Sequence, residues 1–497
     1  MSASELSAPA SVKWPFQTTT SWRTLPTPFW SDCSPAGAAA PELVVFNTPL
    51  CEALNLPLAD MPRDVLARWL SGSDLPDTCQ PLAQAYAGHQ FGGFTMLGDG
   101  RAHLLAEFEG PDGIRRDLQL KGSGRTPYSR GGDGRAALGP MLREFVISEA
   151  MAALGIPTSR SLAVLRTGET LWRDGPLPGA VLTRIAASHL RVGTFEYAAA
   201  LRDRSALEAL LTYAVQRHDP DLADVPEPGA RVLAWLNRVA ERQIDLILHW
   251  LRVGFIHGVM NTDNTFISGE TLDYGPCAFL DEFVPNKVFS SIDRHGRYGF
   301  ENQKRIILWN LARLAEAVLP LLDEDPKDAL DRARTALKNW DTRLNARWLS
   351  MMRGKLGLDT ERPEDESLIK DLLAWMHRYE ADYTLTFRAL ADDAAERLPE
   401  ARHPKVQDWI RRWRARLAEE GPVTAARFEA MQAVNPARIP RNHQVEAALT
   451  SAEAGHMAPL RTLLAALAEP YRDDPAYTAF AQPPTPDERV VRTFCGT

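Results

Sequence analysis

The sequence predicts an α+β protein, in which a β-rich front lobe with one key helix precedes a larger helical lobe. Before about residue 195, short apolar or alternating runs are separated by glycines, as in strands joined by turns. After Phe195, apolar residues recur at helical spacing up to about residue 420. At 497 residues the chain is also too long for one small core, so two or three lobes are expected.

Composition narrows the class of protein. Apolar residues make up 45% and charged residues 24%, which is ordinary for a soluble globular protein. The net charge of -8, from 56 Lys+Arg and 64 Asp+Glu, argues against a nucleic-acid-binding protein built on bulk positive charge. No apolar run reaches the length of a membrane span, and the N-terminus lacks the order of a secretory signal. We therefore expect a cytoplasmic protein with no membrane or nucleic-acid partner, and a monomer.

Four segments follow from the changes in composition along the chain. Residues 1–80 are rich in Pro, Ser, Thr and Trp, with one short strand at 43–46, and are interpreted as an extension that packs on the lobes. Residues 81–194 form the front lobe and residues 195–420 the helical lobe, in which 231–254 and 302–322 are clear helices. Residues 421–497 hold one more helical portion and a polar tail.

A glycine-rich stretch, YAGHQFGGFTMLGDGRAHLLAEF, opens the front lobe. Glycines let the backbone approach a ligand closely, and successive N–H groups can then face a phosphate, although most such loops are only turns. The strand after it, 117–121, alternates so that Gln119 and Lys121 share one face and Leu118 and Leu120 the other. A lysine so placed can hold nucleotide phosphates. It can equally be a solvated strand lysine.

The rest of the front lobe adds further candidates. Residues 122–135 form a glycine-dense, basic loop, and a helix is predicted from about 139 to 154. Glu144 in this helix could reach back to Lys121, or could simply favour a helix N-terminus. Strands at 161–166 and 169–173 are predicted to be joined by a turn at 167–168. Arg184 and Arg191 flank the next strand, where they could bind phosphate or be surface charges.

Residues 254–283 are the centre of the prediction. The run TFI, then Ser268-Gly269, then ETL predicts a β-hairpin that sets Asn264 beside Asp273. Two oxygen ligands with spare coordination positions suit Mg²⁺ or Mn²⁺ carrying nucleotide phosphates. The alternative is an ordinary surface hairpin with acidic ends.

The order of these features resembles a protein-kinase-like fold: a glycine-rich loop, a strand lysine, a helix glutamate, His257 seven residues before Asn264, and Asp273-Tyr-Gly. Kinases place a catalytic Asp two residues after the histidine. Here that position is Val259, so by kinase logic the chain is a pseudokinase.

A more specific resemblance rests on long motifs and runs from roughly residue 40 to the C-terminus. YAGHQFG, LGDGRA, LQLKGSGRTPYSRGGDGRAALGP, HGVMNTDN and DYGP together resemble the selenoprotein O (SelO) family of protein adenylyltransferases. The resemblance implies transfer of AMP from ATP to Ser, Thr or Tyr hydroxyls of protein substrates, with ATP bound in the reverse sense to that of kinases. It implies ATP contacts by Gly98, Gly100, Arg101, Lys121, Asp133, Gly134, Arg184, Arg191 and Asp273.

The same resemblance assigns the chemistry. Glu144 would hold Lys121, Asn264 and Asp273 would bind Mg²⁺ or Mn²⁺, and Asp263 would accept the proton. Reversed binding of ATP presents the α-phosphate to the acceptor hydroxyl of the protein substrate. The missing Asp at 259 is then not required if another carboxylate reaches that hydroxyl. Two alternatives stay open: UMP transfer from UTP by the same site, and a nucleotide-binding pseudokinase scaffold without catalysis. A complete metal site weighs against the scaffold.

The five cysteines, at 33, 51, 79, 277 and 495, show no metal-site spacing. Family members that bear selenocysteine carry it near the C-terminus, where this chain has Cys495. We hypothesise a disulfide between Cys277 and Cys495 that would make activity redox-sensitive. The alternative is two unpaired thiols.

Overall fold

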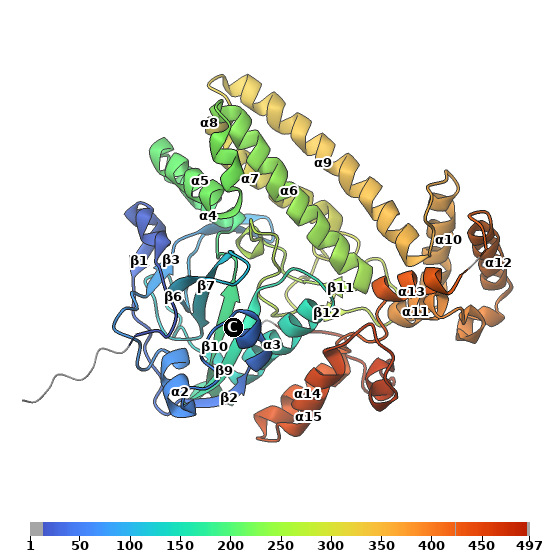
Figure 1. Cartoon of the computed structure of the whole chain (residues 1–497), viewed down its shortest axis with the longest axis horizontal. Coiled ribbons are helices and arrows are strands. Elements are labelled where there is room, and N and C mark those ends of the chain that lie inside the picture. The colour runs from blue at the N-terminus through green and yellow to red at the C-terminus, as the bar shows by residue number, and fades with distance from the viewer. Residues whose placement is uncertain (1–12, 423, 495–497) are drawn as a thin grey trace, which may run out of the picture. The chain divides into compact units, whose positions relative to one another are not determined.

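The computed structural model describes residues 13–422 and 424–494, and its architecture is α+β, as predicted (Figure 1). The described chain forms two compact units. The first comprises the chain up to Ala85, Leu97–Met141 and Arg160–His189; the second comprises Tyr86–Met96, Leu142–Ser159 and the chain from Leu190 onward. No described helix is long and apolar enough to cross a membrane.

The first unit is built on one antiparallel sheet of eight strands, in the order β1-β3-β6-β7-β10-β9-β2, with β8 paired to β10. The strands are β1 Trp30–Asp32, β2 Glu42–Phe46, β3 Leu82–Gln84, β6 Ala102–Glu109, β7 Arg115–Lys121, β8 Ala136–Ala137, β9 Arg160–Trp172 and β10 Pro176–Ala186. Its helical segments are η1 Ser21–Thr24, η2 Thr27–Phe29, α1 Thr48–Ala53 and α2 Arg63–Ser71.

The alternation predicted for β7 is confirmed. Leu118 and Leu120 are fully buried in an apolar core shared with Trp69 and Leu70 of α2. Burial of such side chains stabilises the sheet by about 1.5–3 kcal/mol each. The opposite face of the strand carries the polar residues Asp117, Gln119 and Lys121.

The predicted pair of strands at 161–166 and 169–173 is wrong, because β9 runs unbroken through them. Gly168 has φ +75° and marks a bulge: the pairing with β10 shifts register between Pro178 and Ala180. A Thr-Gly pair predicts a turn, but a glycine at positive φ fits a bulge equally well. The partner strand, far away in sequence, decides between them.

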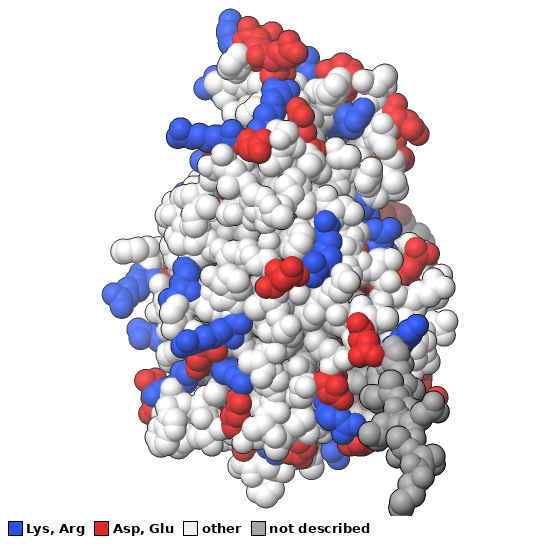
Figure 2. Space-filling model, turned by 90° about the vertical axis from the view of Figure 1, so that its left-hand side faces the viewer, with Lys and Arg blue, Asp and Glu red and all other residues white. Residues whose placement is uncertain are grey.

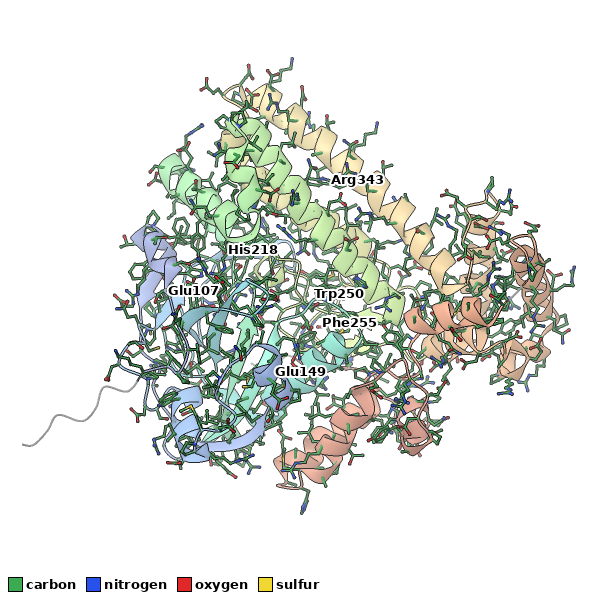
Figure 3. The ribbon with its side chains drawn as sticks, viewed as in Figure 1. Glu107, Glu149, His218, Trp250, Phe255 and Arg343 are labelled. Carbon is green, nitrogen blue, oxygen red and sulfur yellow. The ribbon has the colours of Figure 1, made fainter. Side chains whose placement is uncertain are left out.

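The segment before β2 is held to the sheet through Glu107 of β6, which is labelled in Figure 3. Its buried carboxylate accepts hydrogen bonds from the Ser21 hydroxyl at 2.5 Å and the Trp22 amide at 3.1 Å. A buried carboxylate is stable only with such donors, so this contact anchors the extension.

The second unit is mainly helical. Its helices are α4 Val192–Ala200, α5 Arg204–His218, α6 Pro228–Val253, α7 Gln303–Ala317, α8 Leu319–Leu322, α9 Pro326–Lys355, α10 Asp365–Arg378, α11 Tyr383–Ala391, α12 Pro404–Ala418, α13 Ala425–Val434, α14 Asn442–Glu453 and α15 Ala458–Leu467. Its 3₁₀ segments are η3 Pro220–Asp224, η4 Thr262–Asn264, η5 Ala395–Arg397, η6 Pro399–Arg402 and η7 Pro475–Ala481. Two small antiparallel pairs complete it: β4 Ala87–Gln90 with β5 Gly93–Met96, and β11 Phe255–Ile256 with β12 Ala278–Phe279.

Helix α6 positions the functional loop. Glu227 caps its N-terminus, and Gly254, with φ +76°, ends it in the left-handed conformation. Helix α9 runs beside it, and Arg343 of α9 forms an ion pair with Glu241 of α6 (Figures 1 and 3). The chain leaves α6 directly into β11.

The predicted helix at 139–154 is present as α3 Leu138–Ala153. From Leu142 onward its residues belong to the second unit. The helix predicted over 302–322 is divided at Val318 into α7 and α8, because Pro320 cannot continue the α7 hydrogen-bond ladder.

Candidate active site

His257, just after β11, organises the loop that carries the predicted catalytic residues. Its ring is fully buried and stacks on Trp250 with centroids 5.2 Å apart. Burial lowers its pKa, which favours the neutral imidazole. Its Nε2 lies 2.7 Å from the Leu272 carbonyl, which accepts the one ring proton, and Nδ1 faces the Val259 amide at 3.4 Å. The histidine thus ties the loop to the residue before Asp273.

The predicted hairpin centred on residues 268–269 is wrong. Phe266 instead bridges to Arg191, and Thr271 bridges in parallel to Thr158, both distant in sequence. The two short apolar runs therefore pair with other parts of the second unit and not with each other. The two predicted metal ligands are brought into one region by His257 and Arg191 and not by a hairpin ladder.

Arg191 is 2% exposed and links the two aspartates of the loop region. Its Nη1 donates to the Asp263 carbonyl at 2.8 Å and lies 3.8 Å from Oδ2 of Asp273. The guanidinium also stacks over the Tyr86 ring, 4.3 Å from its centroid. A cation held here offsets the negative charge that two nearby carboxylates bring together.

Asp263 is 6% exposed, which is unusual for a carboxylate. Gln90 donates from Nε2 to its Oδ2 at 3.2 Å, whereas its buried Oδ1 has no hydrogen-bond partner among the described residues. Burial raises the pKa of Asp263 to about 6, and the charge of Asp273 adds to this, while Gln90 and Arg191 oppose it. A carboxylate with a pKa near neutrality can accept a proton from a substrate.

Asn264 and Asp273 offer oxygen ligands for a cation. Nδ2 of Asn264 donates to the Val259 carbonyl at 3.0 Å, so the amide oxygen points away from that carbonyl. Asp273 has φ +60°, a left-handed conformation that costs a non-glycine residue about 1–2 kcal/mol. Its side chain is 23% exposed. Hard oxygen ligands in small number fit Mg²⁺ or Mn²⁺, which take further oxygens from phosphates.

The first unit carries a connected row of polar side chains around β7. Arg184 donates from Nε to Gln119 Oε1 at 2.8 Å, and Gln119 donates from Nε2 to Asp99 Oδ2 at 3.2 Å. The Asp99 carboxylate also accepts the Gln84 amide at 3.2 Å. The roles of Gln119 and Asp99 were not predicted. Asp99 lies between Gly98 and Gly100, which are predicted to bind ATP. This position in the sequence could have identified Asp99 as a candidate site residue.

The glycines of the first unit are required by close packing between the two loops and within the loop at 122–135. At Gly98, with φ +140°, a Cβ would lie 2.4 Å from the Tyr128 ring. At Gly134, with φ +69°, it would lie 2.1 Å from the Gly124 carbonyl oxygen. Gly100 lies against the Tyr128 carbonyl, where a Cβ would come within 3.1 Å. The loops are therefore fixed against each other by residues without side chains.

Asp133, at the exposed end of these loops, forms an ion pair with Arg173 at 2.9 Å and accepts the Arg135 amide at 2.9 Å. Partial burial opposes ionisation, but these two donors hold the pKa of Asp133 below its usual range. Arg101 precedes β6, and its carbonyl accepts the Gly122 amide at 2.7 Å. Both residues lie in the first unit.

The predicted pair of Lys121 and Glu144 is divided between the two units. Lys121 ends β7 and is 5% exposed; Glu144 lies on the part of α3 that belongs to the second unit and is 6% exposed. Both side chains are thus buried within the chain. Their pairing stays a prediction.

The sequence matches the model of a family described as "Protein adenylyltransferase SelO" over residues 14–468. The chain belongs to the SelO family. Three curated relatives, each called "Protein nucleotidyltransferase YdiU", are similar over nearly their whole length: 52% identical in Nitrosococcus oceani (98% of both chains), 52% in a Bradyrhizobium species (98% of this chain, 100% of the relative) and 50% in Rhizobium etli (96% of both). The chain is accordingly an enzyme of the nucleotidyltransferase class.

The redox prediction for this SelO chain falls partly outside the described residues, because Cys495 is one of those not described. Cys277 is fully buried, and burial raises the pKa of its thiol to about 12. The described end of the tail contacts Pro276, the residue before Cys277. The Thr493 hydroxyl donates to the Pro276 carbonyl at 2.5 Å, and the Thr493 amide donates to the Phe289 carbonyl at 2.8 Å.

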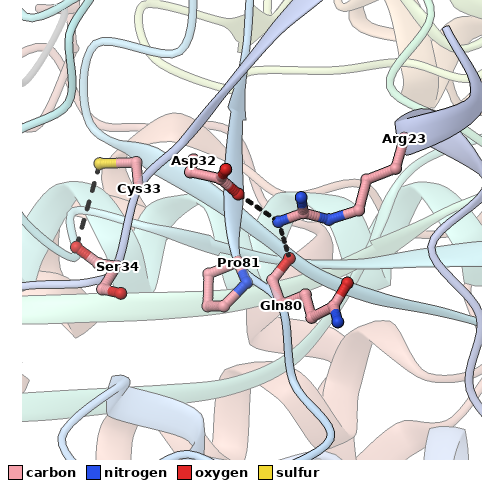
Figure 4. A pocket seen from close by; sticks show the side chains of 6 residues that line it. All are labelled: Arg23, Asp32, Cys33, Ser34, Gln80 and Pro81. Carbon is pink, nitrogen blue, oxygen red and sulfur yellow. Dashed lines mark hydrogen bonds and ion pairs between the residues drawn. The ribbon is translucent and has the colours of Figure 1, made fainter.

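A separate cavity of about 470 Å³ opens in the first unit (Figure 4). Its lining includes Arg23, which bonds the Asp32 carboxylate and the Gln80 carbonyl, and the half-buried Cys33. None of the predicted SelO site residues lines it.

On the face drawn in Figure 2, positive and negative side chains are interspersed.

Proposed function

We propose that this SelO enzyme transfers AMP from ATP to Ser, Thr or Tyr hydroxyls of proteins, with ATP reversed relative to its pose in kinases. The observation that carries the proposal is Asp263: a buried carboxylate whose pKa is raised to about 6, beside two candidate metal ligands. Val259 occupies the place where a kinase has its base, so the ordinary γ-phosphoryl route has no proton acceptor there.

The proposed fold is protein-kinase-like. Residues 81–194 would be the β-rich lobe and residues 195–420 the helical lobe, with 1–80 and 421–497 as extensions. The antiparallel sheet of the first unit and the helices of the second support this division in outline. The helix α3 and the strand lysine are the elements that such a fold uses to hold a nucleotide.

Asp263 would remove the proton from the acceptor hydroxyl as that oxygen bonds to the α-phosphorus. The bond from the α-phosphorus to the bridging oxygen breaks, and pyrophosphate leaves. Arg191 holds the Asp263 backbone and neutralises part of the local negative charge. Asn264 and Asp273 would hold a divalent cation, which supplies charge neutralisation at the phosphates when bound.

The remaining nucleotide contacts belong to the first unit. There Lys121 and Arg184 would bind phosphate oxygens, with Glu144 of the second unit positioning the lysine. Asp99 and Gln119 support this role, because they hold the Arg184 side chain in a fixed direction. The nucleotide would be surrounded by Arg101, Asp133 and the glycines of the two loops. These glycines are Gly98, Gly100 and Gly134.

The test uses ATP labelled in turn at the α- and the γ-phosphate, with Mg²⁺ or Mn²⁺ and candidate protein acceptors. Label transferred only from the α position is expected. Label only from the γ position would restore a kinase and refute the proposal. Asp263→Asn should abolish transfer while leaving nucleotide binding intact, since the carboxylate is assigned to the proton and not to the phosphates.

UMP transfer from UTP by the same residues is the second candidate. It is favoured by the name of the curated relatives, which specifies a nucleotidyl group and not adenylyl. Parallel reactions with α-labelled ATP and UTP, each competed by the other nucleotide, separate the two. A catalytically inactive scaffold would bind nucleotide and transfer neither label.

A further inference from the structure

The β4–β5 hairpin belongs to the second unit, although first-unit residues flank it on both sides in sequence. Gln90 on β4 donates from Nε2 to Oδ2 of Asp263 at 3.2 Å. At Gly88, a Cβ would lie 2.3 Å from Oδ1 and 2.8 Å from Cγ of the same aspartate. Alternate residues of a strand share a face, so one face of β4 meets both carboxylate oxygens.

A second contact fixes β4 to the loop. The His89 amide donates to the Thr262 hydroxyl at 2.7 Å, and that hydroxyl donates to the buried Glu196 at 2.5 Å. The other carboxylate oxygen of Glu196 lies 2.5 Å from Nδ1 of His89, which closes the network. Thr262 precedes the aspartate directly, so the network limits movement of the backbone at that point.

The hairpin turn is anchored in the same way. Phe91 and Gly92 both have positive φ, +52° and +92°, as a two-residue turn of this kind requires. The Phe91 amide lies 3.1 Å from both Asn261 Oδ1 and the Tyr298 hydroxyl, and its ring packs on Tyr298. Three consecutive hairpin residues therefore contact three consecutive loop residues.

We propose that Gln90 and Gly88 are positioning residues for the Asp263 carboxylate in nucleotidyl transfer. The inference rests on the proposed function. With no side chain at Gly88, Oδ1 is enclosed against the strand, and the Gln90 amide occupies one lone pair of Oδ2. The second lone pair of Oδ2 then receives the proton of the acceptor hydroxyl as the acceptor oxygen bonds to the α-phosphorus and pyrophosphate leaves.

The first test is Gln90→Met, which keeps the length of the side chain but removes its amide donor. Loss of a hydrogen bond to a charged group is expected to lower kcat about 10- to 100-fold. The KM for ATP and the Kd for α,β-methylene-ATP should change less than about 2-fold, since the residue is assigned to the base and not to nucleotide binding. Met96→Ala, an exposed position on the same hairpin, is the matched control and should transfer AMP at the wild-type rate.

Gly88→Ala is the second variant, because its Cβ would displace the carboxylate without removing the amide. It should also lose kcat and retain nucleotide affinity. Wild-type kcat in Gln90→Met, or a loss confined to KM, would overturn the inference. Asp263→Asn distinguishes failure of the proposed function from failure of this inference. Full activity of Asp263→Asn would refute the proposed base itself. An inactive Asp263→Asn together with a fully active Gln90→Met would refute only the positioning role.

Discussion

Replacing His257 by leucine tests whether the buried imidazole holds the catalytic loop to the segment that carries Asp273. The substitution leaves the buried Leu272 carbonyl without its donor at 2.7 Å and removes the ring stacked 5.2 Å from Trp250. An unsatisfied buried carbonyl costs about 1–3 kcal/mol, and the lost aromatic pair about 0.5–1.5 kcal/mol. Histidine and leucine side chains have nearly the same volume, so the substitution leaves no large cavity that would lower the stability further. We expect the free energy of unfolding to fall by about 2–4 kcal/mol.

Calorimetric unfolding of wild type and His257→Leu measures this loss, and AMP transfer is assayed at a temperature where both are folded. His257→Gln is the control, since its amide nitrogen can donate from about the position of Nε2. It should recover part of the stability and of the transfer rate. Unchanged unfolding and wild-type transfer in His257→Leu would show that the loop is held by other contacts.

Three further results are expected. Asp273→Asn should raise the Mg²⁺ or Mn²⁺ concentration needed for half-maximal transfer, because a charged ligand becomes neutral; an unchanged metal dependence would contradict its role. Burial lowers the pKa of His103 to about 4, below its unfolded value of about 6.5, so the unfolded chain binds more protons between these pH values. Wild type should therefore lose stability relative to His103→Gln as the pH falls from 6.5 to 4, by at most about 3 kcal/mol, in paired thermal unfolding scans. Oxidation should link Cys277 to Cys495 and lower transfer, as non-reducing peptide mapping checks; a Cys277→Ser variant equally sensitive to oxidant would exclude the link.

The sequence predicted elements whose periodicity is local and strong. The alternation of β7 and the long amphipathic run of α6 are present at the predicted places. In each segment, the spacing of its own apolar residues determines which face is buried. The segment 257–264 follows β11 and includes η4, whereas the catalytic role that its motif indicates stays a prediction.

The errors arose where a distant partner decides the local structure. Phe266 and Thr271 looked like two halves of one hairpin, but each pairs with a segment that no local pattern connects to it. Gly168 was interpreted as a turn and is a bulge. The contact of Gln90 with Asp263 spans 173 positions and leaves no periodic signal.

The route of the chain has a consequence for any attempt to divide this enzyme. The backbone passes between the two units five times, at Ala85, Met96, Met141, Ser159 and His189. A fragment ending near residue 194 would carry the β4–β5 hairpin and most of α3 without the residues that bury them, and would expose apolar surface. The helical remainder would lack the strand that covers its proposed base. We therefore expect that neither part of a chain cut near residue 194 folds to its native structure alone.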